Sequence, residues 1–175
     1  PNSRRMIDRV AKLQKECLNM EDVLNDFLQF AKAGQPDLTE CSLNEEVQEF
    51  LKFLAPQAEG RNVELRPLLD ANLPTVRLDP GLIKQVLRNL ARNALQAMPD
   101  GGTLELLTMT RDGEIALEVI DSGEGMDEKT VTRMFQAFFS TRSGGSGLGL
   151  PTVRRIIEAH GGTIACDSAP GRGTR

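Results

Sequence analysis

The sequence has few cysteines, no run of residues apolar enough to span a membrane and no marked excess of basic charge. Its three cysteines, Cys17, Cys41 and Cys166, are widely spaced and make neither a disulfide framework nor a zinc pattern, so a reducing, cytoplasmic compartment fits best. The 21 basic residues are balanced by 25 acidic ones, which argues against general nucleic-acid binding. No apolar run approaches the roughly 18–20 residues of a membrane span, and no signal peptide precedes the first helix. Any membrane attachment would therefore depend on regions upstream of this chain.

The length and the ends of the chain predict a piece of a longer protein. With 175 residues, 39% of them hydrophobic, the chain can build one ordinary core plus an appendage. It begins inside an amphipathic segment and stops at Thr174-Arg175, directly after a Gly-x-Gly turn where a further strand is expected. We predict an appendage over residues 1–36 and a globular domain over residues 37–175 whose last strand is truncated.

The appendage carries a heptad pattern. Apolar residues recur in alternating steps of four and three, which predicts a helix ending near Gly34. The seam comprises Met6, Val10, Leu13, Cys17, Met20, Leu24, Phe27 and Ala31. Further apolar residues widen the stripe at Ile7, Val23, Leu28 and Phe30. We expect this helix to pack in a bundle whose partners are not all present; the alternative is an ordinary helix on its own domain's core. Gly34-Gln-Pro36-Asp37 is predicted to be a linker.

In the rest of the chain, helices and hairpin strands interleave without a regular βαβ rhythm. Helices are predicted at Leu43–Gly60, Asp79–Met98 and Leu148–His160. Extended segments are predicted at Asn62–Leu69, Thr75–Leu78, Thr103–Thr110, Glu114–Ile120 and Thr163–Asp167, and Arg111-Asp-Gly113 should close a hairpin. The pattern predicts an α/β two-layer sandwich with a mixed sheet.

The first of two glycine clusters, Asp121-Ser-Gly-Glu-Gly-Met126, follows an alternating apolar run. Asp121 should therefore stand at the end of a strand with its carboxylate turned into a cavity. A buried carboxylate needs a hydrogen-bond donor, and the amino group of a purine is a suitable one. Gly123 and Gly125 would let the backbone approach a flat ring without a Cβ in the way.

The second cluster, Gly144-Gly-Ser-Gly-Leu-Gly-Leu150, comes after a helical segment and a phenylalanine-rich loop. Gly145, Gly147 and Gly149 bare their amides just before a predicted helix that has Pro151 in its first turn. Amides and the positive end of a helix together favour a polyphosphate. The spacing matches neither a Walker loop nor the dinucleotide fingerprint. Together, the two clusters predict a nucleotide pocket with a lid, which we place at Phe135–Gly147.

The helix predicted over Asp79–Met98 carries a polar stripe beside its apolar face. Asn89 and Asn93 are four residues apart, so their amides stack on one edge of the helix. Asparagine is unfavourable inside helices, so two on one stripe need a reason. Asn93 can offer a neutral oxygen to Mg²⁺, which takes most remaining ligands from nucleotide phosphates. The alternative is a solvated helix face.

Taken in order, these segments resemble the sensor histidine kinases of two-component signalling, within the wider GHKL group of ATP-binding proteins. The family's N box, first glycine box, phenylalanine box, second glycine box and last glycine box resemble, respectively, Gln85–Ala94, Asp121–Met126, Met134–Phe139, Gly145–Leu150 and Gly171–Thr174. The resemblance covers nearly the whole chain. It implies the Bergerat or GHKL ATP-binding fold, a mixed sheet packed on three helices, preceded here by the long heptad helix.

The resemblance implies roles for the matched residues. Asp121 would bind the adenine amino group, Asn93 would coordinate Mg²⁺, and Asn89 would support the phosphates or the water shell of the ion. Arg142 stands where the family often has a lid cation that pairs with the β- or γ-phosphate; the alternative is a solvated loop arginine. The implied catalytic residues are Asn89, Asn93 and Arg142. The implied nucleotide-binding residues are Asn89, Asn93, Asp121, Gly123, Gly125, Met126, Phe138, Arg142, Gly145, Gly147, Leu148, Gly149, Leu150 and Thr174. Phe135, Phe138 and Phe139 are expected to anchor the lid to the core.

The sequence departs from relatives in the wider group at informative places. Where the gyrase-type ATPases have a water-activating glutamate, this chain has Asn89, and an amide cannot take a proton at neutral pH. Slow hydrolysis and donation of the γ-phosphate to another nucleophile therefore fit better. Gln96 and Ala97 replace a frequent Lys-Tyr pair of the family, which leaves one phosphate contact open.

The resemblance also implies partners. In this family the phosphate acceptor is a histidine on the first helix of a dimeric hairpin, and the phosphate passes on to a response regulator's receiver domain. The heptad helix resembles the second hairpin helix, so the chain should bind ATP without phosphorylating itself and should belong to a homodimer. The single histidine, His160, is predicted to be structural, at the end of a helix. The alternatives are a GHKL nucleotide-sensing module, an anti-sigma-type serine kinase and an ATPase proper.

Overall fold

The structure is a computed structural model that describes residues 2–32, 35–142 and 145–175. The predicted helix stop at Gly34 and the first glycine of the second cluster, Gly144, lie outside the described residues. The described elements, in chain order, are α1 (Asn2–Lys32), β1 (Thr39–Cys41), α2 (Leu43–Glu59), β2 (Val63–Leu69), β3 (Val76–Leu78), α3 (Pro80–Ala97), β4 (Gly102–Arg111), β5 (Glu114–Asp121), α4 (Glu128–Arg133) and α5 (Gly149–Ala159).

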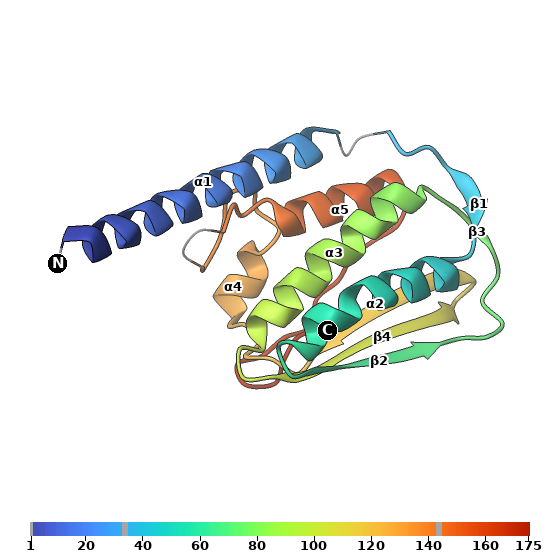
Figure 1. Cartoon of the computed structure of the whole chain (residues 1–175). Helices are drawn as coiled ribbons and strands as arrows, with labels where there is room; N and C mark the ends of the chain where they lie inside the picture. Colours follow the sequence, from blue (N-terminus) through green and yellow to red (C-terminus); the bar gives the residue numbers. More distant parts are fainter. Residues whose placement is uncertain (1, 33–34, 143–144) are drawn as a thin grey trace.

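The main sheet is mixed and has the strand order β2-β4-β5. β2 runs parallel to β4, whereas β4 and β5 form an antiparallel hairpin. The hairpin turn places Asp112 at φ +53° and Gly113 at φ +82°, the left-handed conformation that two-residue hairpin loops require. Helices α2, α3 and α5 form a layer over this sheet (Figure 1). The predicted two-layer α/β sandwich is confirmed.

Helix α3 is the element on which the site is built, and its start is locally encoded. The side chain of Asp79 accepts a hydrogen bond from the Leu82 amide (3.0 Å), and Pro80 occupies the first turn, where its missing N–H has no partner to lose. One face of α3 packs with α2 and the sheet, and another, through Val86, packs with Val153 and Ile156 of α5. Each such fully buried aliphatic side chain contributes roughly 1.5–3 kcal/mol. These two contacts fix the direction in which the polar stripe of α3 points.

The predicted strand Thr163–Asp167 is not formed. Thr174 exchanges backbone hydrogen bonds with Asp121 at the end of β5, and Arg175 exchanges them with Asp167. The last two residues therefore lie between β5 and the returning chain, and among the described residues no backbone pairs with 163–166. A short apolar segment needs a neighbouring strand to pair with, and its own sequence does not show whether one is present.

Two other extended segments differ in pairing from the expectation of a simple mixed sheet. β1 was not predicted, and it pairs antiparallel with β3 in a separate two-stranded sheet. The segment predicted at Thr75–Leu78 therefore leaves the main sheet. β1 has only three residues, too few for the alternation that identifies a strand.

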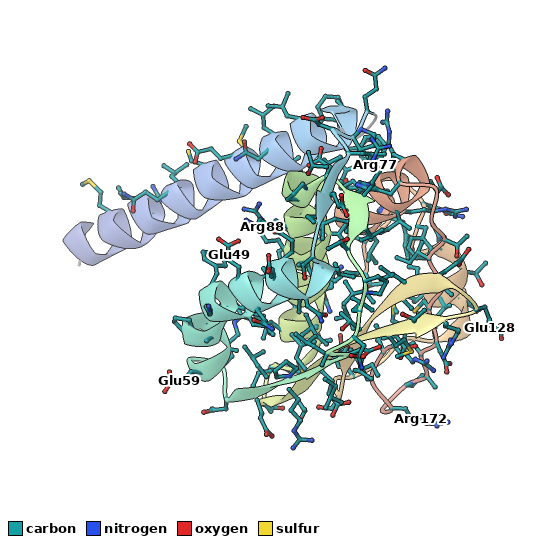
Figure 2. All side chains as sticks on the ribbon, turned by 90° about the vertical axis from the view of Figure 1, so that its right-hand side faces the viewer. Glu49, Glu59, Arg77, Arg88, Glu128 and Arg172 are labelled. Carbon is teal, nitrogen blue, oxygen red and sulfur yellow. The ribbon has the colours of Figure 1, made fainter. Side chains whose placement is uncertain are left out.

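Helix α1 contacts the rest of the molecule near its C-terminal end, and its N-terminal half projects away from the body in both views (Figures 1 and 2). The apolar seam is exposed along the projecting part, with Met6, Leu13 and Met20 among the most exposed large side chains. Near the other end, the Phe30 carbonyl accepts a hydrogen bond from Arg155 of α5 (3.0 Å). Within the described ranges, no helix is both long and apolar enough to cross a bilayer.

Candidate nucleotide-binding site

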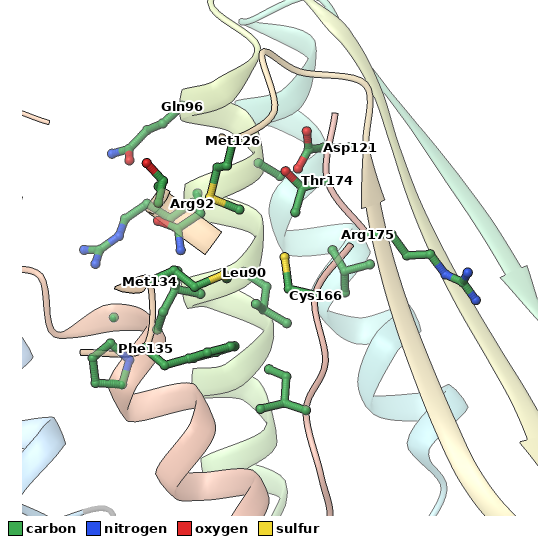
Figure 3. Close-up of a pocket in the computed structure, with 18 of the residues that line it drawn as sticks. Leu90, Arg92, Gln96, Asp121, Met126, Met134, Phe135, Cys166, Thr174 and Arg175 are labelled. Carbon is green, nitrogen blue, oxygen red and sulfur yellow. The ribbon is translucent and has the colours of Figure 1, made fainter. Parts of the chain in front are cut away.

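A cavity of about 1060 Å³ opens between α3, β5, the lid and the start of α5 (Figure 3). Its volume lies just above the roughly 300–1,000 Å³ that ligand pockets usually occupy. Ten of the sequence-predicted site residues line it: Asn93, Asp121, Gly125, Met126, Arg142, Gly145, Gly147, Gly149, Leu150 and Thr174. Residues from five separate stretches of the chain therefore converge on one cavity.

Asp121 closes β5 and lies half-buried on the wall beside Thr174 (Figure 3). Its Oδ1 accepts a hydrogen bond from the Gly123 amide at 2.9 Å. Burial raises the pKa of the Asp121 carboxyl, while hydrogen bonds from Gly123 and Thr174 and the charge of Arg142 oppose the shift. The carboxylate is therefore only partly satisfied by the protein. It retains the capacity to accept a hydrogen bond from a donor in the cavity, as an adenine amino group would supply.

Two glycines hold this end of the cavity together by close backbone approach. Gly125 has φ +66°, and a Cβ built on it would overlap the Ala169 carbonyl oxygen. Gly173 has φ +71°, and a Cβ there would overlap the Asp121 carbonyl oxygen. Gly123 was predicted to lie against a flat ring, but the side of its backbone that would carry a Cβ packs against α3. A Cβ built on Gly123 would lie 2.5 Å from the Ala97 carbonyl oxygen. Gly123 supports the floor of the cavity from behind.

The start of α5 forms another wall. No side chain caps this helix, and Gly149 is its first residue. The predicted residue Leu148 is fully buried beneath the helix start and contributes packing there. Asn89 is also buried, at 7% exposure; its Oδ1 would lie 3.3 Å from a Cβ on Gly149. Asn89 does not line the large cavity but a smaller cleft of about 330 Å³ beside it. Free helix-start amides at a cavity wall favour a polyphosphate.

Asn93 lies one turn beyond Asn89 on α3 and faces the large cavity. Among residues 2–32, 35–142 and 145–175, no group of three His, Cys, Asp or Glu side chains could hold a metal ion. A single amide oxygen at a polyphosphate site nevertheless suits Mg²⁺, which keeps several waters and takes its other ligands from phosphates. The donor set fits Mg²⁺ bound together with a nucleotide and not a metal bound by the protein alone.

Arg142 joins the lid to the opposite rim of the cavity. Its Nη1 donates to Gln96 Oε1 of α3 (2.8 Å), and its Nη2 lies 3.6 Å from Glu124 Oε1 in the first glycine cluster. The Gln96 side chain, which stands in place of a frequent family lysine, thus holds the lid arginine over the mouth. Both partners of Arg142 are exposed enough for the contact to be exchanged for a phosphate at modest cost.

The phenylalanines of the lid do not act alike. Phe135 and Phe139 line the cavity, and the Arg133 guanidinium stacks 4.2 Å from the centre of the Phe139 ring. Phe138 does not anchor the lid as expected, because its side chain is 71% exposed and lies outside the cavity lining. The cause is its backbone: φ of +64° and a hydrogen bond from its amide to Gly147 (3.0 Å) direct the ring to solvent.

Cys166 and Arg92 line the cavity but were not predicted from the sequence, and Gln96 was predicted only as a replacement at a phosphate contact. Cys166 faces the cavity below Thr174, and Arg92 and Gln96 lie across from it on α3 (Figure 3). Apolar side chains of β5 and the C-terminal segment complete the wall, among them Leu117, Val119 and Ile164. The adjacency of Arg92 to Asn93 was a usable signal. Cys166 gave none, because its strand prediction did not say which face it occupies.

His160 has the structural position that was predicted for it. Its Nε2 accepts a hydrogen bond from the Asp79 amide (3.0 Å), and its Nδ1 lies 2.7 Å from the Ile156 carbonyl oxygen. Because the Asp79 amide can only donate, Nδ1 carries the ring proton. His160 therefore ties the end of α5 to the start of α3. It is not among the residues that line the cavity.

These features have counterparts in known proteins. The chain belongs to the family of histidine kinase-, DNA gyrase B- and HSP90-like ATPases, whose family model matches residues 78–175. That match includes α3, both glycine clusters and the lid.

Histidine kinases are among the curated relatives and the solved structures that are similar to this chain. The chain is 32% identical over 162 residues to the sensor histidine kinase ZraS of Escherichia coli (strain K12), covering 93% of this chain and 35% of that protein. The crystal structure of full-length ShkA in complex with AMPPNP superimposes with a TM-score of 0.83 at 28% identity, over 95% of this chain and 36% of that one. Histidine kinase ThkA in complex with response regulator protein TrrA gives a TM-score of 0.74 at 26% identity, over 92% and 46%. The chain spans about a third of the length of the curated relatives it matches.

Proposed function

We propose that this chain is the ATP-binding catalytic region of a sensor histidine kinase. It would transfer the γ-phosphate of ATP to a histidine on a hairpin helix, for onward transfer to a response-regulator aspartate. The observation that carries the proposal is the single cavity bounded by a half-buried carboxylate, Asp121, and by the uncapped start of α5, with Asn93 also on its wall. A purine and a polyphosphate require these groups together.

The residues of the chain supply position and charge. Bound Mg²⁺ would neutralise phosphate charge and orient the transferred group. Asp121 would accept a hydrogen bond from the adenine amino group, the α5 amides would donate hydrogen bonds to phosphate oxygens, and the amide oxygen of Asn93 would coordinate the ion. Arg142 exchanges Gln96 and Glu124 for a phosphate and so draws the lid over the nucleotide. In-line transfer depends mainly on such positioning. Asn89 cannot act as a base toward water, which favours a protein nucleophile over hydrolysis.

The same proposal assigns α1 and the partners. Residues 1–36 comprise the linker and the second helix of a dimerisation hairpin; that helix is α1, with its exposed heptad seam, and the acceptor histidine lies on the first helix of the hairpin. Residues 37–175 form the catalytic domain. The response-regulator partner is supported by the complex of ThkA with TrrA. A cytoplasmic location stays a prediction. A nucleotide-sensing module or an anti-sigma-type serine kinase is the second candidate, and the heptad helix favours the first reading, since the anti-sigma type lacks it.

The test is phosphotransfer in trans. The chain is mixed with Mg²⁺ and γ-labelled ATP and with a hairpin made of α1 and the helix encoded before it, which should contain a His-Glu/Asp-x-x-Asn/Thr-Pro sequence. We expect acid-labile, base-stable label on the hairpin histidine. Asn93→Ala should abolish the labelling and the Mg²⁺ dependence of nucleotide binding, whereas Asn72→Ala, an exposed asparagine in the turn after β2, should leave both unchanged. ATP binding without any labelling of the hairpin would favour the sensing module, and absence of ATP binding would refute the proposal.

A further inference from the structure

A polar junction joins α1, α3 and the lid at the edge of the cavity. The Asp26 carboxylate of α1 is only 14% exposed, and its Oδ2 accepts hydrogen bonds from Arg92 Nη2 of α3 (3.2 Å) and from Ser146 Oγ of the lid (2.6 Å). Two groups that come from different elements therefore converge on a single carboxylate oxygen. Charge-assisted contacts of this kind are the stronger class of hydrogen bond.

The junction lies at the start of α5. Ser146 Oγ, which donates to Asp26, also accepts a hydrogen bond from the Leu148 amide (3.3 Å). Arg92 Nη2 would lie 3.3 Å from a Cβ on Gly149, the first residue of the helix. The Asp26 carboxylate is therefore linked to the uncapped start of α5 through the hydroxyl group of Ser146, and it also forms an ion pair with Arg92. This is the environment that a phosphate group prefers.

The junction also separates two spaces. Asp26 and Arg92 both line the large cavity and the small cleft beside it, whose other walls include Arg88, Asn89 and Gln85. The Gln85 Nε2 atom is buried and has no hydrogen-bond partner among the described residues. Arg142 is engaged elsewhere, with Gln96 and Glu124, so the two arginines serve different sides of the cavity.

We propose that Asp26 stands in for the terminal phosphate of the nucleotide, and that Arg92 and Ser146 bind the γ-phosphate once Asp26 withdraws. This inference rests on the proposed function of the same cavity. Arg92 is then a further phosphate-binding residue. The docked state of α1 and the binding of a nucleoside triphosphate compete for the same two donors. A diphosphate or monophosphate, which lacks the third phosphate, competes little or not at all.

The test compares ATP, ADP and AMP by calorimetric titration of the whole chain in the presence of Mg²⁺. Asp26→Asn removes the charge and keeps the shape; Glu21→Gln removes the same charge from an exposed position of α1 and serves as the control. We expect Asp26→Asn to tighten ATP binding roughly three- to tenfold and to leave ADP and AMP affinities unchanged within twofold. Asp26→Ala should also tighten ATP binding, so the result does not depend on the correct folding of a single variant. Glu21→Gln should change none of the affinities.

The Arg92→Gln variant distinguishes binding of the γ-phosphate by Arg92 from a role of Arg92 in holding α1 alone. If Arg92 served only to hold α1, its loss would free the cavity and tighten ATP binding, as Asp26→Asn does. If Arg92 binds the γ-phosphate, its loss should weaken ATP binding roughly tenfold and leave ADP nearly unaffected. Equal effects of Asp26→Asn on ATP, ADP and AMP, no effect on ATP, or tighter ATP binding by Arg92→Gln would overturn the inference. Failure of the unmodified chain to bind ATP would instead refute the proposed function.

Discussion

Replacing Asp121 by asparagine should make the unliganded protein more stable and at the same time cost it its nucleotide. Burial raises the pKa of this carboxyl in the folded state, so its ionisation opposes folding. The stability that the protonated group contributes is complete below the ordinary pKa of an unfolded aspartate and is lost as pH rises through the raised folded-state pKa. Asparagine does not ionise and can keep the hydrogen bond from the Gly123 amide. The variant therefore avoids that loss.

The expected cost to binding follows from the hydrogen bond that the carboxylate would make. A hydrogen bond to a charged group contributes about 1.5–3 kcal/mol, which corresponds to a roughly ten- to 150-fold rise in the Kd for ATP. Such a loss of function with a gain of stability is typical of a residue that is kept for its ligand.

Thermal unfolding across pH and calorimetric titration with ATP measure the two effects. Without nucleotide, the Tm of Asp121→Asn should equal that of the parent at acidic pH and exceed it at neutral pH, the gap opening above the ordinary range of aspartate. With excess ATP the order should invert, because only the parent gains the full stabilisation by ligand. Asp112→Asn, in the exposed β4–β5 turn, is the matched control and should change neither quantity.

Two results would refute this reasoning. A lower Tm of Asp121→Asn than of the parent at neutral pH would show that the carboxylate stabilises the apo fold. A Kd for ATP within twofold of the parent would show that Asp121 does not bind the base.

Three further predictions concern the frame of the site. Gly125→Ala should lower the free energy of unfolding by about 1–3 kcal/mol and disrupt nucleotide binding, because the position combines a positive φ with overlap of the new Cβ onto Ala169. Gly171, the control position, has a similar φ of +73° but open space around it, so Gly171→Ala should cost only the backbone strain and leave binding unchanged. Denaturant titration measures the stability of both variants, and calorimetry measures their nucleotide binding. His160→Ala should destabilise the chain by about 1–2 kcal/mol, because it leaves the Asp79 amide without its acceptor, and an accompanying loss of ATP affinity would contradict its structural role. Burial, together with the charges of Asp167 and Asp121, raises the pKa of the Cys166 thiol. Mass spectrometry should therefore find that Cys166 is alkylated more slowly than the exposed Cys17, and more slowly still when ATP is bound in the cavity that Cys166 lines. Alkylation of Cys166 at the same rate with and without ATP would place the nucleotide elsewhere.

Much of the fold could be predicted because its signals are local. Asp79 followed by Pro80 specifies the start of α3, and the observed helix begins there. The Arg111-Asp-Gly turn specifies the β4–β5 hairpin, and the register Arg111 to Glu114 confirms it. The place of Asp121 at the end of β5 follows from that hairpin, so its position on the cavity wall was within reach of the sequence.

Other features depended on partners far away in the chain. Thr163–Asp167 is apolar enough to predict a strand, yet pairing is decided by which backbone lies beside it. Thr174 pairs with Asp121 at the end of β5, and Arg175 pairs with Asp167. Phe138 looked like an anchor because it is aromatic, but its positive φ is fixed by contact with Gly147 and turns the ring to solvent.

The sequence by itself determined the secondary structure around the site, the two glycine clusters and the residue types that can bind a purine, a polyphosphate and Mg²⁺, because caps, turns and helical periodicity act over a few residues. Only the tertiary structure decided where these groups lie relative to the cavity and which residues they contact. It placed Asn89 in a cleft beside the cavity and Asn93 within it, tied Arg142 to Gln96, and brought Asp26 and Ser146, 120 residues apart in the chain, within hydrogen-bonding distance. Such contacts arise from the packing of whole helices against one another, and the burial that drives that packing does not depend on separation along the chain.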